Sequence, residues 1–422
     1  MIEKIQIQNF KSIRDLELEL GRVNVFIGEN GSGKTNILEA IGVSAAAGVK
    51  NLDEDYLALK GIRVNSPKMM KSGFNKDNQN EPVFITISVK GQSFTFKLEE
   101  EDNKKIWKND EIRFEPKLAV NDFINTVGLL QLLENPKFIE LYTKSLENSL
   151  DTKIEKVEVD KKINLAVKET IKLLPDTIGS DNWNNFVQNG QKEMLKVISD
   201  TKVTQFLIFC PENTLLRRTD TEGHTRPLGI RGEGLLSYIS QLNQEKPDVF
   251  EAIKNELVLF SWFKDFEIYQ DFLTGGSNVK LTDKFLAEGI KTIDLRNANE
   301  GFLFVLFYIT LFTSEDTPQF FAIDNFDNAL NPKLCSELIK ILIKIAKEKG
   351  KQVILTTHNP AVLDGLDLKD DEQRLFVVSR KIETGDTKVK RILKKQTPFG
   401  ESTTKLSESF MNGSIGGLPQ NF

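Results

Sequence analysis

The segment at residues 28–35, GENGSGKT, has the residue types and spacing of a phosphate-binding loop, G-x-x-x-x-G-K-[ST]. The run RVNVFIG, which is more continuously apolar than the two strand-like runs before it, leads into it, and ILEAIGVSAAAG, whose composition favours a helix, follows it. Glycines let backbone amides turn inward around phosphate oxygens at the positive end of the following helix. The order strand, loop and helix therefore predicts binding of a nucleoside triphosphate, whereas a simple glycine turn with an exposed lysine would not require these flanks.

Two residues of this loop have specific expected roles. Lys34 is expected to reach the β- and γ-phosphates, and the hydroxyl of Thr35 is expected to bind Mg²⁺. The residues expected to surround the nucleotide here are Gly28, Asn30, Gly31, Ser32, Gly33, Lys34, Thr35 and Asn36.

Two further apolar strands end in residues that suit the same site. Phe320–Ile323 are followed by Asp324, which we expect to bind Mg²⁺ together with Thr35. Val353–Thr357 are followed by His358, one of only two histidines in the chain. We expect His358 to hydrogen-bond the γ-phosphate, although a histidine after a strand is more often structural when it stands alone.

The order and spacing of these motifs resemble the ABC-type ATPases of the RecF, SMC and OLD kind. The resemblance rests on residues 28–35, Phe320–Asp324 and Thr356–Pro360. The opening MIEKIQIQNFKSIRDLELEL is similar to the start of these proteins, and the ending FMNGSIGGLPQNF is similar to the OLD-like branch. The resemblance is specific over residues 1–45 and 300–422 and much weaker between them. It implies a head domain that binds ATP between two subunits, with the phosphate-binding loop of one subunit facing a signature loop of the other.

This resemblance places the signature loop at Asn297–Gly301, directly before the apolar run GFLFVLFYITLF. The family usually has a serine near the position of Asn299. An asparagine can still donate a hydrogen bond to a γ-phosphate, and Gly301 preserves a close approach of the backbone. A second interpretation is that Asn299 caps the helix that follows, and both interpretations can hold for one residue.

One position departs from the family pattern. Members usually follow the metal-binding aspartate with a glutamate that polarises the attacking water, and the residue in that place is Asn325. An amide can orient water but cannot accept its proton, so we expect Asp324, Asn325 and His358 to hydrolyse ATP slowly. Loss of a general base typically lowers a rate by about 10²–10⁴-fold. Asp327 could compensate only if the loop does not carry its carboxylate away from the strand end, and ordinary turnover through another base is the alternative.

The patterns around these motifs predict the architecture. Strand-like alternation opens the chain and returns over residues 81–114, while strands alternate with helices in the last third, which indicates a parallel sheet. We expect an α/β fold: an ABC-type P-loop NTPase head, with a mixed sheet, an antiparallel β subdomain and a helical insertion. The expected parts are residues 1–119 with the P-loop and the β subdomain, a helical insertion at 120–200, and residues 201–422 with the signature, Asp324, His358 and a terminal hairpin. Within the last part, one helix is expected over residues 247–263.

The composition excludes several classes of protein. The chain has 422 residues, with 56 Lys and Arg against 61 Asp and Glu, and a net charge of −5. Two cysteines and two histidines leave no material for a disulfide framework or a Cys- or His-based zinc site. The most apolar stretch, residues 301–312, is shorter than the roughly 20 residues of a membrane span, and no secretory signal opens the chain. We expect a cytoplasmic protein without membrane contact. The charge does not indicate DNA binding. A basic cluster on the terminal hairpin could bind phosphate groups, although lysines that protect a solvated edge strand are the favoured interpretation. The cluster consists of Lys388, Lys390, Arg391, Lys394 and Lys395.

The resemblance also implies a function. Stand-alone ATPases of bacterial antiphage systems are similar, with PtuA of Septu and AriA of PARIS as cases in which a nuclease is a separate chain. We expect that no Toprim nuclease of the kind found in OLD proteins follows Pro360. We expect a homodimer or higher homo-oligomer, formed through the ATP site, that scaffolds or gates a separate effector, a nuclease. The alternative is a RecF- or SMC-like ATPase that binds DNA in repair or maintenance.

Overall fold

The computed structural model describes residues 1–74, 81–100, 107–116, 202–218, 227–270, 277–287, 292–393 and 405–418. The helical insertion predicted at residues 120–200 lies outside the described residues. So do His224 and the last two lysines of the basic cluster, Lys394 and Lys395.

A six-stranded sheet, in the order β14-β13-β3-β12-β11-β7, forms the centre of the described part of the chain. Its strands are β3 (Val23–Ile27), β7 (Ile208–Phe209), β11 (Phe320–Ile323), β12 (Gln352–Thr357), β13 (Gln373–Arg380) and β14 (Thr387–Ile392). Strand β14 runs antiparallel to β13, while the other neighbouring pairs are parallel. Every residue of β3, β11 and β12 is buried, which explains why these segments are largely apolar on both faces instead of alternating.

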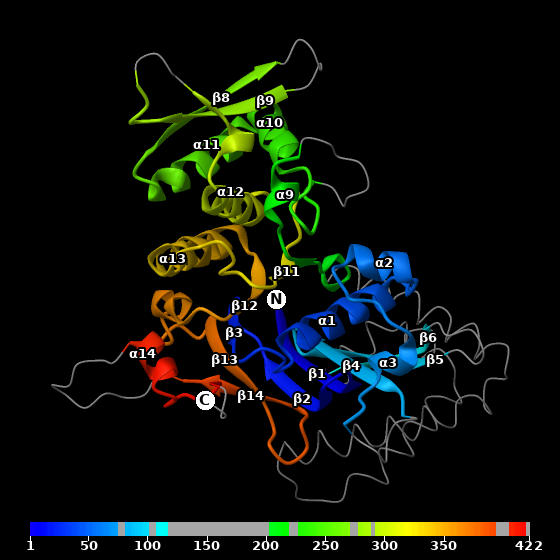
Figure 1. Ribbon diagram of the computed structural model, residues 1–422. Coiled ribbons are helices and arrows are strands. Elements are labelled where there is room, and N and C mark those ends of the chain that lie inside the picture. The colour runs from blue at the N-terminus through cyan, green and yellow to red at the C-terminus, as the bar shows by residue number, and fades with distance from the viewer. Residues whose placement is uncertain are drawn as a thin grey trace, which may run out of the picture.

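Helices cover both faces of this sheet (Figure 1). Helix α1 (Lys34–Gly48) packs on the face that carries Phe26 and Ile354. Helices α12 (Glu300–Thr313) and α13 (Pro332–Lys349) pack on the opposite face with Leu355. Successive strand residues point to opposite faces, so the strand ends deliver side chains alternately toward α1 and toward α12 and α13.

The two helices on the second face are specified in different ways. The apolar run at residues 301–312 is buried all round inside α12, as its uniform hydrophobicity requires. Helix α13 is amphipathic, and it begins at a cap in which Asn331 Oδ1 accepts a hydrogen bond from Leu334 N. It ends at Gly350, which has the left-handed backbone conformation common after helices. Among the described residues, no helix is long and apolar enough to cross a membrane.

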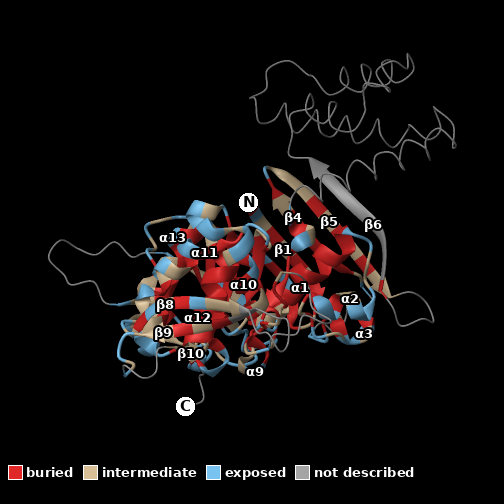
Figure 2. Cartoon of the chain, turned by 90° about the horizontal axis from the view of Figure 1, so that it is seen from above, coloured by how far each residue is buried: buried red, intermediate tan, exposed pale blue. Residues whose placement is uncertain are grey.

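A five-stranded antiparallel sheet, in the order β2-β1-β4-β5-β6, packs on the other side of α1 (Figure 1). Its strands are β1 (Ile2–Phe10), β2 (Ile13–Glu19), β4 (Val83–Val89), β5 (Gln92–Glu100) and β6 (Trp107–Pro116). Strands β1, β2 and β4 alternate between buried and less buried residues, because one face packs on the core and the other faces solvent. Figure 2 shows this alternation of red with paler residues along β4 and β5. The short helices α2 (Glu54–Leu59) and α3 (Pro67–Met70) follow α1.

A third group of elements lies beyond α12. It contains a three-stranded antiparallel sheet of β8 (Phe263–Gln270), β9 (Ser277–Asp283) and β10 (Ile293–Asp294), with α9 (Asn213–Leu216), α10 (Leu235–Glu245) and α11 (Pro247–Glu256). The helix predicted over residues 247–263 is too long. It ends at Glu256, a 3₁₀ turn covers Leu257–Leu259, and Phe263 already belongs to β8. The reason is tertiary: Phe263 packs edge-on against Phe266 and beside Phe302 of α12, which a strand allows.

The chain closes with η5 (Pro360–Gly365), the hairpin of β13 and β14, and α14 (Leu406–Met411). Ser407 at the start of α14 donates from both its backbone N and its Oγ to the carboxylate of Asp364 in η5. The predicted fold class is confirmed: a mixed sheet with helices on both faces stands beside an antiparallel β subdomain.

A buried charge cluster ties the antiparallel β subdomain to the P-loop helix. Glu39 of α1 is fully buried, and its carboxylate accepts from Lys11 Nζ at 2.6 Å and from Arg63 Nε at 2.7 Å. Arg63 N also donates to Glu39 Oε1 at 3.1 Å. A carboxylate at such a position must be paired, because an isolated buried charge is very costly. Glu39 therefore fastens the β1–β2 turn and the segment after α2 onto α1.

Glu39→Ala is expected to lower the free energy of unfolding by about 3 kcal/mol, because it leaves Lys11 partly buried without its partner. Urea denaturation measures the change. The control is Glu17→Ala, which removes an exposed ion pair with Lys4 and should change the free energy by less than about 1 kcal/mol. Equal effects of the two substitutions would contradict the assignment.

Candidate nucleotide-binding site

The P-loop (residues 28–35) crosses from the end of β3 to the first turn of α1 at the carboxyl edge of the central sheet (Figure 1). Two of its glycines are required by close contacts. A Cβ at Gly28 would lie 2.0 Å from the carbonyl oxygen of Val378, and a Cβ at Gly33 would lie 2.1 Å from Thr387 Oγ1. Gly33 also has a φ of 108°, which side chains rarely adopt. The loop is thus held against β13 and β14, with Asn30 and Gly31 exposed at its tip.

Lys34 lies inside the loop instead of extending into solvent. It is 5% exposed, and its Nζ donates to the carbonyl oxygens of Gly28 at 2.8 Å and Glu29 at 3.0 Å. Burial lowers the pKa of Lys34 to about 8, although the nearby carboxylates of Asp324 and Asp327 act in the opposite direction. An anion beside this ammonium would offset the cost of its burial, which suits a phosphate site.

Asp324 and Thr35 meet across the sheet edge. Strand β12 lies between β3, which leads into the P-loop, and β11, which ends before Asp324. Thr35 Oγ1 donates to Asp324 Oδ2 at 2.9 Å, and Thr356 Oγ1 at the end of β12 donates to Asp324 Oδ1. Asn325 N in turn donates to Thr356 Oγ1 at 2.9 Å. Both predicted metal ligands therefore lie in contact, and Thr356 holds the carboxylate in place.

The chain turns back sharply after Asp324. Asn325 has a φ of 55°, and Asn328 N donates to the carbonyl oxygen of Asn325 at 3.0 Å. Phe326 is fully buried, and its backbone N donates to the carbonyl oxygen of Thr356. The sequence predicted a displaced Asp327 if the loop left the strand in extended form. Because the loop turns instead, Asp327 Oδ1 accepts from Thr357 Oγ1 at 2.7 Å.

His358 lies at the tip of β12, between the P-loop and the loop after β11. Its backbone N donates to Asp327 Oδ1 at 3.2 Å, and its imidazole hydrogen-bonds the backbone of Gly28. Partial burial is the main cause that lowers the pKa of His358, with the charge of Lys34 acting in the same direction. Asp327 and Asp324 raise it. The geometry thus places His358 next to the phosphate-binding residues, mainly as a neutral imidazole at neutral pH.

The predicted signature residues lie at the start of α12. Asn299 Oδ1 accepts from Phe302 N at 2.8 Å, so Asn299 is the N-cap of this helix. A Cβ at Gly301 would lie 3.2 Å from the carbonyl oxygen of Ala329 in the loop after β11. No hydrogen bond or ion pair joins Asn297–Gly301 to the P-loop within the part of the chain that the structure describes. In a single chain, the signature and the P-loop therefore remain separate.

Several residues that no motif indicated hold the P-loop in place. Ser12 Oγ accepts from Asn36 Nδ2 at 2.7 Å and shares a hydrogen bond with Thr387 Oγ1 at 2.7 Å. Thr387 Oγ1 also donates to the carbonyl oxygen of Ser32 at 3.0 Å, and Arg380 Nε donates to that of Gly31 at 2.7 Å. The terminal hairpin and the β1–β2 turn thus hold the P-loop by hydrogen bonds, and we call the pair Ser12 and Thr387 the clasp. Only spatial proximity reveals it, since Ser12 and Thr387 lie 375 positions apart.

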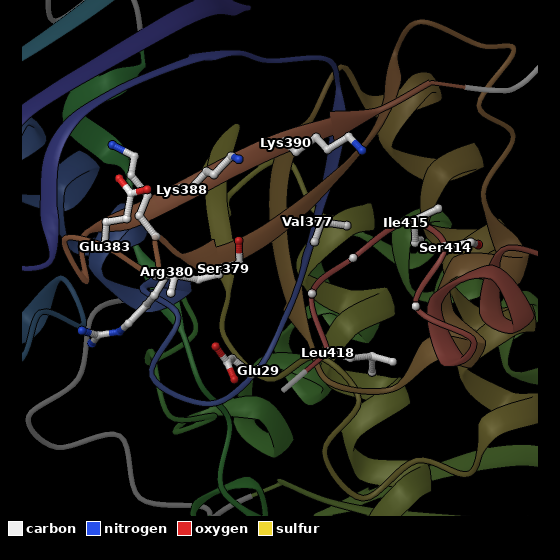
Figure 3. Close-up of a pocket in the computed structure, with 15 residues that line it drawn as sticks. Glu29, Val377, Ser379, Arg380, Glu383, Lys388, Lys390, Ser414, Ile415 and Leu418 are labelled. Carbon is white, nitrogen blue, oxygen red and sulfur yellow. The ribbon is translucent and has the colours of Figure 1, made fainter. Parts of the chain in front are cut away.

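A pocket of about 880 Å³ opens on the outer side of the P-loop (Figure 3). Glu29 borders it on the P-loop, Lys388 and Lys390 of β14 on the hairpin, and Ile415 and Leu418 on the C-terminal turn. Lys388 and Lys390 are exposed, and β14 is the edge strand among the described strands. This pattern agrees with lysines that protect a sheet edge.

The residues present fit a nucleotide with Mg²⁺. The side chain of Ser32 is buried, and its Oγ has no hydrogen-bond partner among the described residues, as expected of a group left for a ligand. Thr35 and Asp324 supply hydroxyl and carboxylate oxygens, which Mg²⁺ prefers. The described residues contain no cluster of three or more Asp, Glu, His or Cys side chains that could hold a metal alone. The phosphates and water would therefore complete the coordination, as is usual for Mg²⁺.

Comparison with protein families agrees with this geometry. A family model described as an AAA ATPase domain matches residues 1–363, which is most of the chain.

Among curated proteins, the DNA replication and repair protein RecF of Listeria monocytogenes serotype 4b (strain CLIP80459) is similar. It is 35% identical over 94 residues, which cover 22% of this chain and 24% of the relative. The protein of the same name from Rickettsia typhi (strain ATCC VR-144 / Wilmington) is 22% identical over 215 residues, 48% of this chain and 53% of the relative. The chain spans only about a quarter to a half of the length of these relatives.

Among solved structures, an SMC head bound to the C-winged helix domain of ScpA aligns with a TM-score of 0.47 and 15% identity. The alignment covers 93% of this chain and 97% of that chain. The SMC head domain from Thermotoga maritima aligns with a TM-score of 0.39 and 13% identity, over 93% and 98% of the two chains.

Thr356→Val is expected to weaken binding of ATP about tenfold when Mg²⁺ is present, because the carboxylate of Asp324 loses a charge-assisted hydrogen bond. Binding with EDTA in place of Mg²⁺ should hardly change. Isothermal titration under both conditions measures the difference. The matched control is Thr310→Val, which removes an equally buried hydroxyl that donates to the carbonyl oxygen of Leu306 within α12. A Thr356→Val protein that binds Mg²⁺ and ATP like the unaltered chain would refute the role of Thr356.

Proposed function

The chain belongs to the AAA ATPase domain family, and from this premise we propose that it binds ATP with Mg²⁺ between two copies of itself. The observation that carries the proposal is the contact of Thr35 Oγ1 with Asp324 Oδ2, which brings the P-loop and the metal-binding strand together. Lys34 would bind the β- and γ-phosphates, and Thr35 and Asp324 would hold the metal. Bound Mg²⁺ would neutralise charge on the phosphate oxygens. His358 would donate a hydrogen bond to a γ-phosphate oxygen.

The position of the signature supports self-association. Asn299 and Gly301 are tied to α12 and to the loop after β11 of their own chain, and not to its P-loop, within the described residues. A signature that contacts the γ-phosphate would therefore do so on a second copy. ATP would then be shared by two chains, and its binding would stabilise the assembly by mass action.

We further propose that hydrolysis is slow and that the ATP-bound assembly scaffolds or gates a separate effector, a nuclease, in bacterial antiphage defence. Asn325 follows Asp324 and cannot accept a proton from water. A long-lived ATP state suits a gate better than a motor. The resemblance to stand-alone defence ATPases supports the separate effector.

A second candidate function is that of an ATPase which itself binds DNA. The observation that favours it is the similarity to proteins named DNA replication and repair protein RecF, at 35% identity over a short segment. The net charge of −5 does not favour it, although Lys388 and Lys390 form a local basic edge.

The mass of the purified chain is expected to double when ATP and Mg²⁺ are added, and light scattering after gel filtration measures it. Lys34→Ala should abolish both ATP binding and the mass change. Asn299→Asp keeps an N-cap but brings a negative charge to the γ-phosphate, so it should bind ATP as a monomer. Asn299→Ser, which keeps the cap and a donor, should still associate. A mass that stays constant while ATP binds would reject the shared site.

The two candidate functions differ in their partners. Co-purification of the chain with the products of neighbouring genes, with and without ATP, is expected to recover a nuclease in an ATP-dependent complex. Tight binding of DNA by the lone chain, with an affinity that falls steeply as salt rises, would instead favour the DNA-binding ATPase.

A further inference from the structure

We infer that Asp327, and not the residue at position 325, accepts the proton of the water that attacks ATP. The inference rests on the proposed ATPase function and names a further catalytic residue for it. It starts from a chemical requirement: water attacks more readily when a positioned base takes its proton. The amide of Asn325 cannot do so.

The backbone explains why an asparagine stands at position 325. Asn325 is exposed and has a φ of 55°, in the left-handed region, and it begins a turn that Asn328 N closes by donating to its carbonyl oxygen. Asparagine enters this region more readily than other residues with side chains, for which it costs about 1–2 kcal/mol. The position is thus adapted to reverse the chain. The reversal seats Phe326 in the core and returns Asp327 to the tip of β12.

One oxygen of Asp327 is fixed and the other is available. Oδ1 accepts from Thr357 Oγ1 at 2.7 Å and from His358 N at 3.2 Å, which hold the carboxylate in one orientation. Oδ2 has no hydrogen-bond partner within the described ranges of the chain. The carboxylate is close enough to act electrostatically on both Lys34 and His358, the two residues expected at the γ-phosphate. A fixed carboxylate with one free oxygen beside these groups has the properties of a general base.

Other carboxylates near the site are committed elsewhere. The two oxygens of Asp324 accept from Thr35 and Thr356, and this residue is the expected metal ligand. Glu212, which follows β7, is paired with Arg231 through two hydrogen bonds of 2.7 Å. Glu29 also acts electrostatically on Lys34, but it lines the pocket of Figure 3 on the outer side of the P-loop and is not among the groups that act on His358. Among these residues, Asp327 alone combines a free oxygen with a position beside Lys34 and His358.

The step balances without another reactant. The oxygen of water forms a bond to the γ-phosphorus, while the bond from that phosphorus to the β–γ bridging oxygen breaks. The electron pair of the broken bond stays on ADP. The proton of the water passes to Asp327 Oδ2 and is released to solvent, which leaves ADP and inorganic phosphate. The turnover that remains without a glutamate at position 325 would proceed through this carboxylate.

The test compares Asp327→Asn and Asp327→Ala in the full chain, through single-turnover hydrolysis of ATP and titration of ATP binding. Both variants are expected to hydrolyse about 10²-fold more slowly while their Kd for ATP stays nearly unchanged. Added formate should restore part of the rate of Asp327→Ala, whose cavity admits a small carboxylate, and should not accelerate the unaltered chain. The matched control is Asp367→Ala. Asp367 also accepts a backbone N–H, from Lys369, but lies in the loop before β13, and its loss should leave the rate unchanged.

Each outcome decides the inference. Unaltered hydrolysis by Asp327→Asn would overturn it, and so would a slow Asp327→Ala whose rate formate does not raise, because a purely structural role would not respond to formate. If Asp327→Ala does not fold, the split between rate and Kd in Asp327→Asn carries the test. Failure of the proposed function is distinguishable, because the unaltered chain would then not bind ATP at all.

Discussion

Asp324 contacts the P-loop through hydrogen bonds from Thr35 and from Thr356 at the end of β12. The rest of the site depends on these hydrogen bonds. The parallel sheet places β12 between the strands that carry the two halves of the site. Thr356 and Thr357 end that strand and point to opposite faces, so each binds a different aspartate, Asp324 or Asp327. Two adjacent hydroxyls thus set the positions of both carboxylates. The buried strands that lead to these residues fix their positions, since a shift of the strand register by one residue would move each side chain to the opposite face of the sheet.

In this arrangement, the buried ammonium of Lys34 is surrounded by oxygen atoms that carry negative charge or partial negative charge. Lys34 is held by two carbonyl oxygens inside the loop, at the start of α1. Its pKa is lowered to about 8 by burial, and the carboxylates of Asp324, Asp327 and Glu29 oppose that effect. A polyphosphate at the helix N-terminus would favour the charged lysine, whereas bound Mg²⁺ would offset the charge of Asp324. The clasp of Thr387 and Ser12 keeps the loop in one shape before a ligand arrives, which lowers the conformational cost of binding.

The sequence was sufficient for the parts of the site that are local in the chain. The P-loop and the strand ending in Asp324 follow from motifs, because parallel strands end at one edge of a sheet. The place of Asp327 did not follow: extended geometry predicted displacement, and the positive φ of Asn325 is a conformation that asparagine permits but does not require. The clasp could not be predicted either, since it joins residues 375 positions apart without a motif. Helix α11 ends earlier than predicted because tertiary packing of Phe263 prevails over helical periodicity.

A structure of the chain with Mg²⁺ and a non-hydrolysable analogue of ATP tests the central claim most directly. The account predicts two copies around each analogue, with Lys34 of one copy and Asn299 of the other at the same γ-phosphate. It also predicts the metal between Thr35 and Asp324, and a water near the γ-phosphate that hydrogen-bonds Asp327 but not Asn325. An analogue enclosed by a single copy, or a metal bound away from Asp324, would contradict the account.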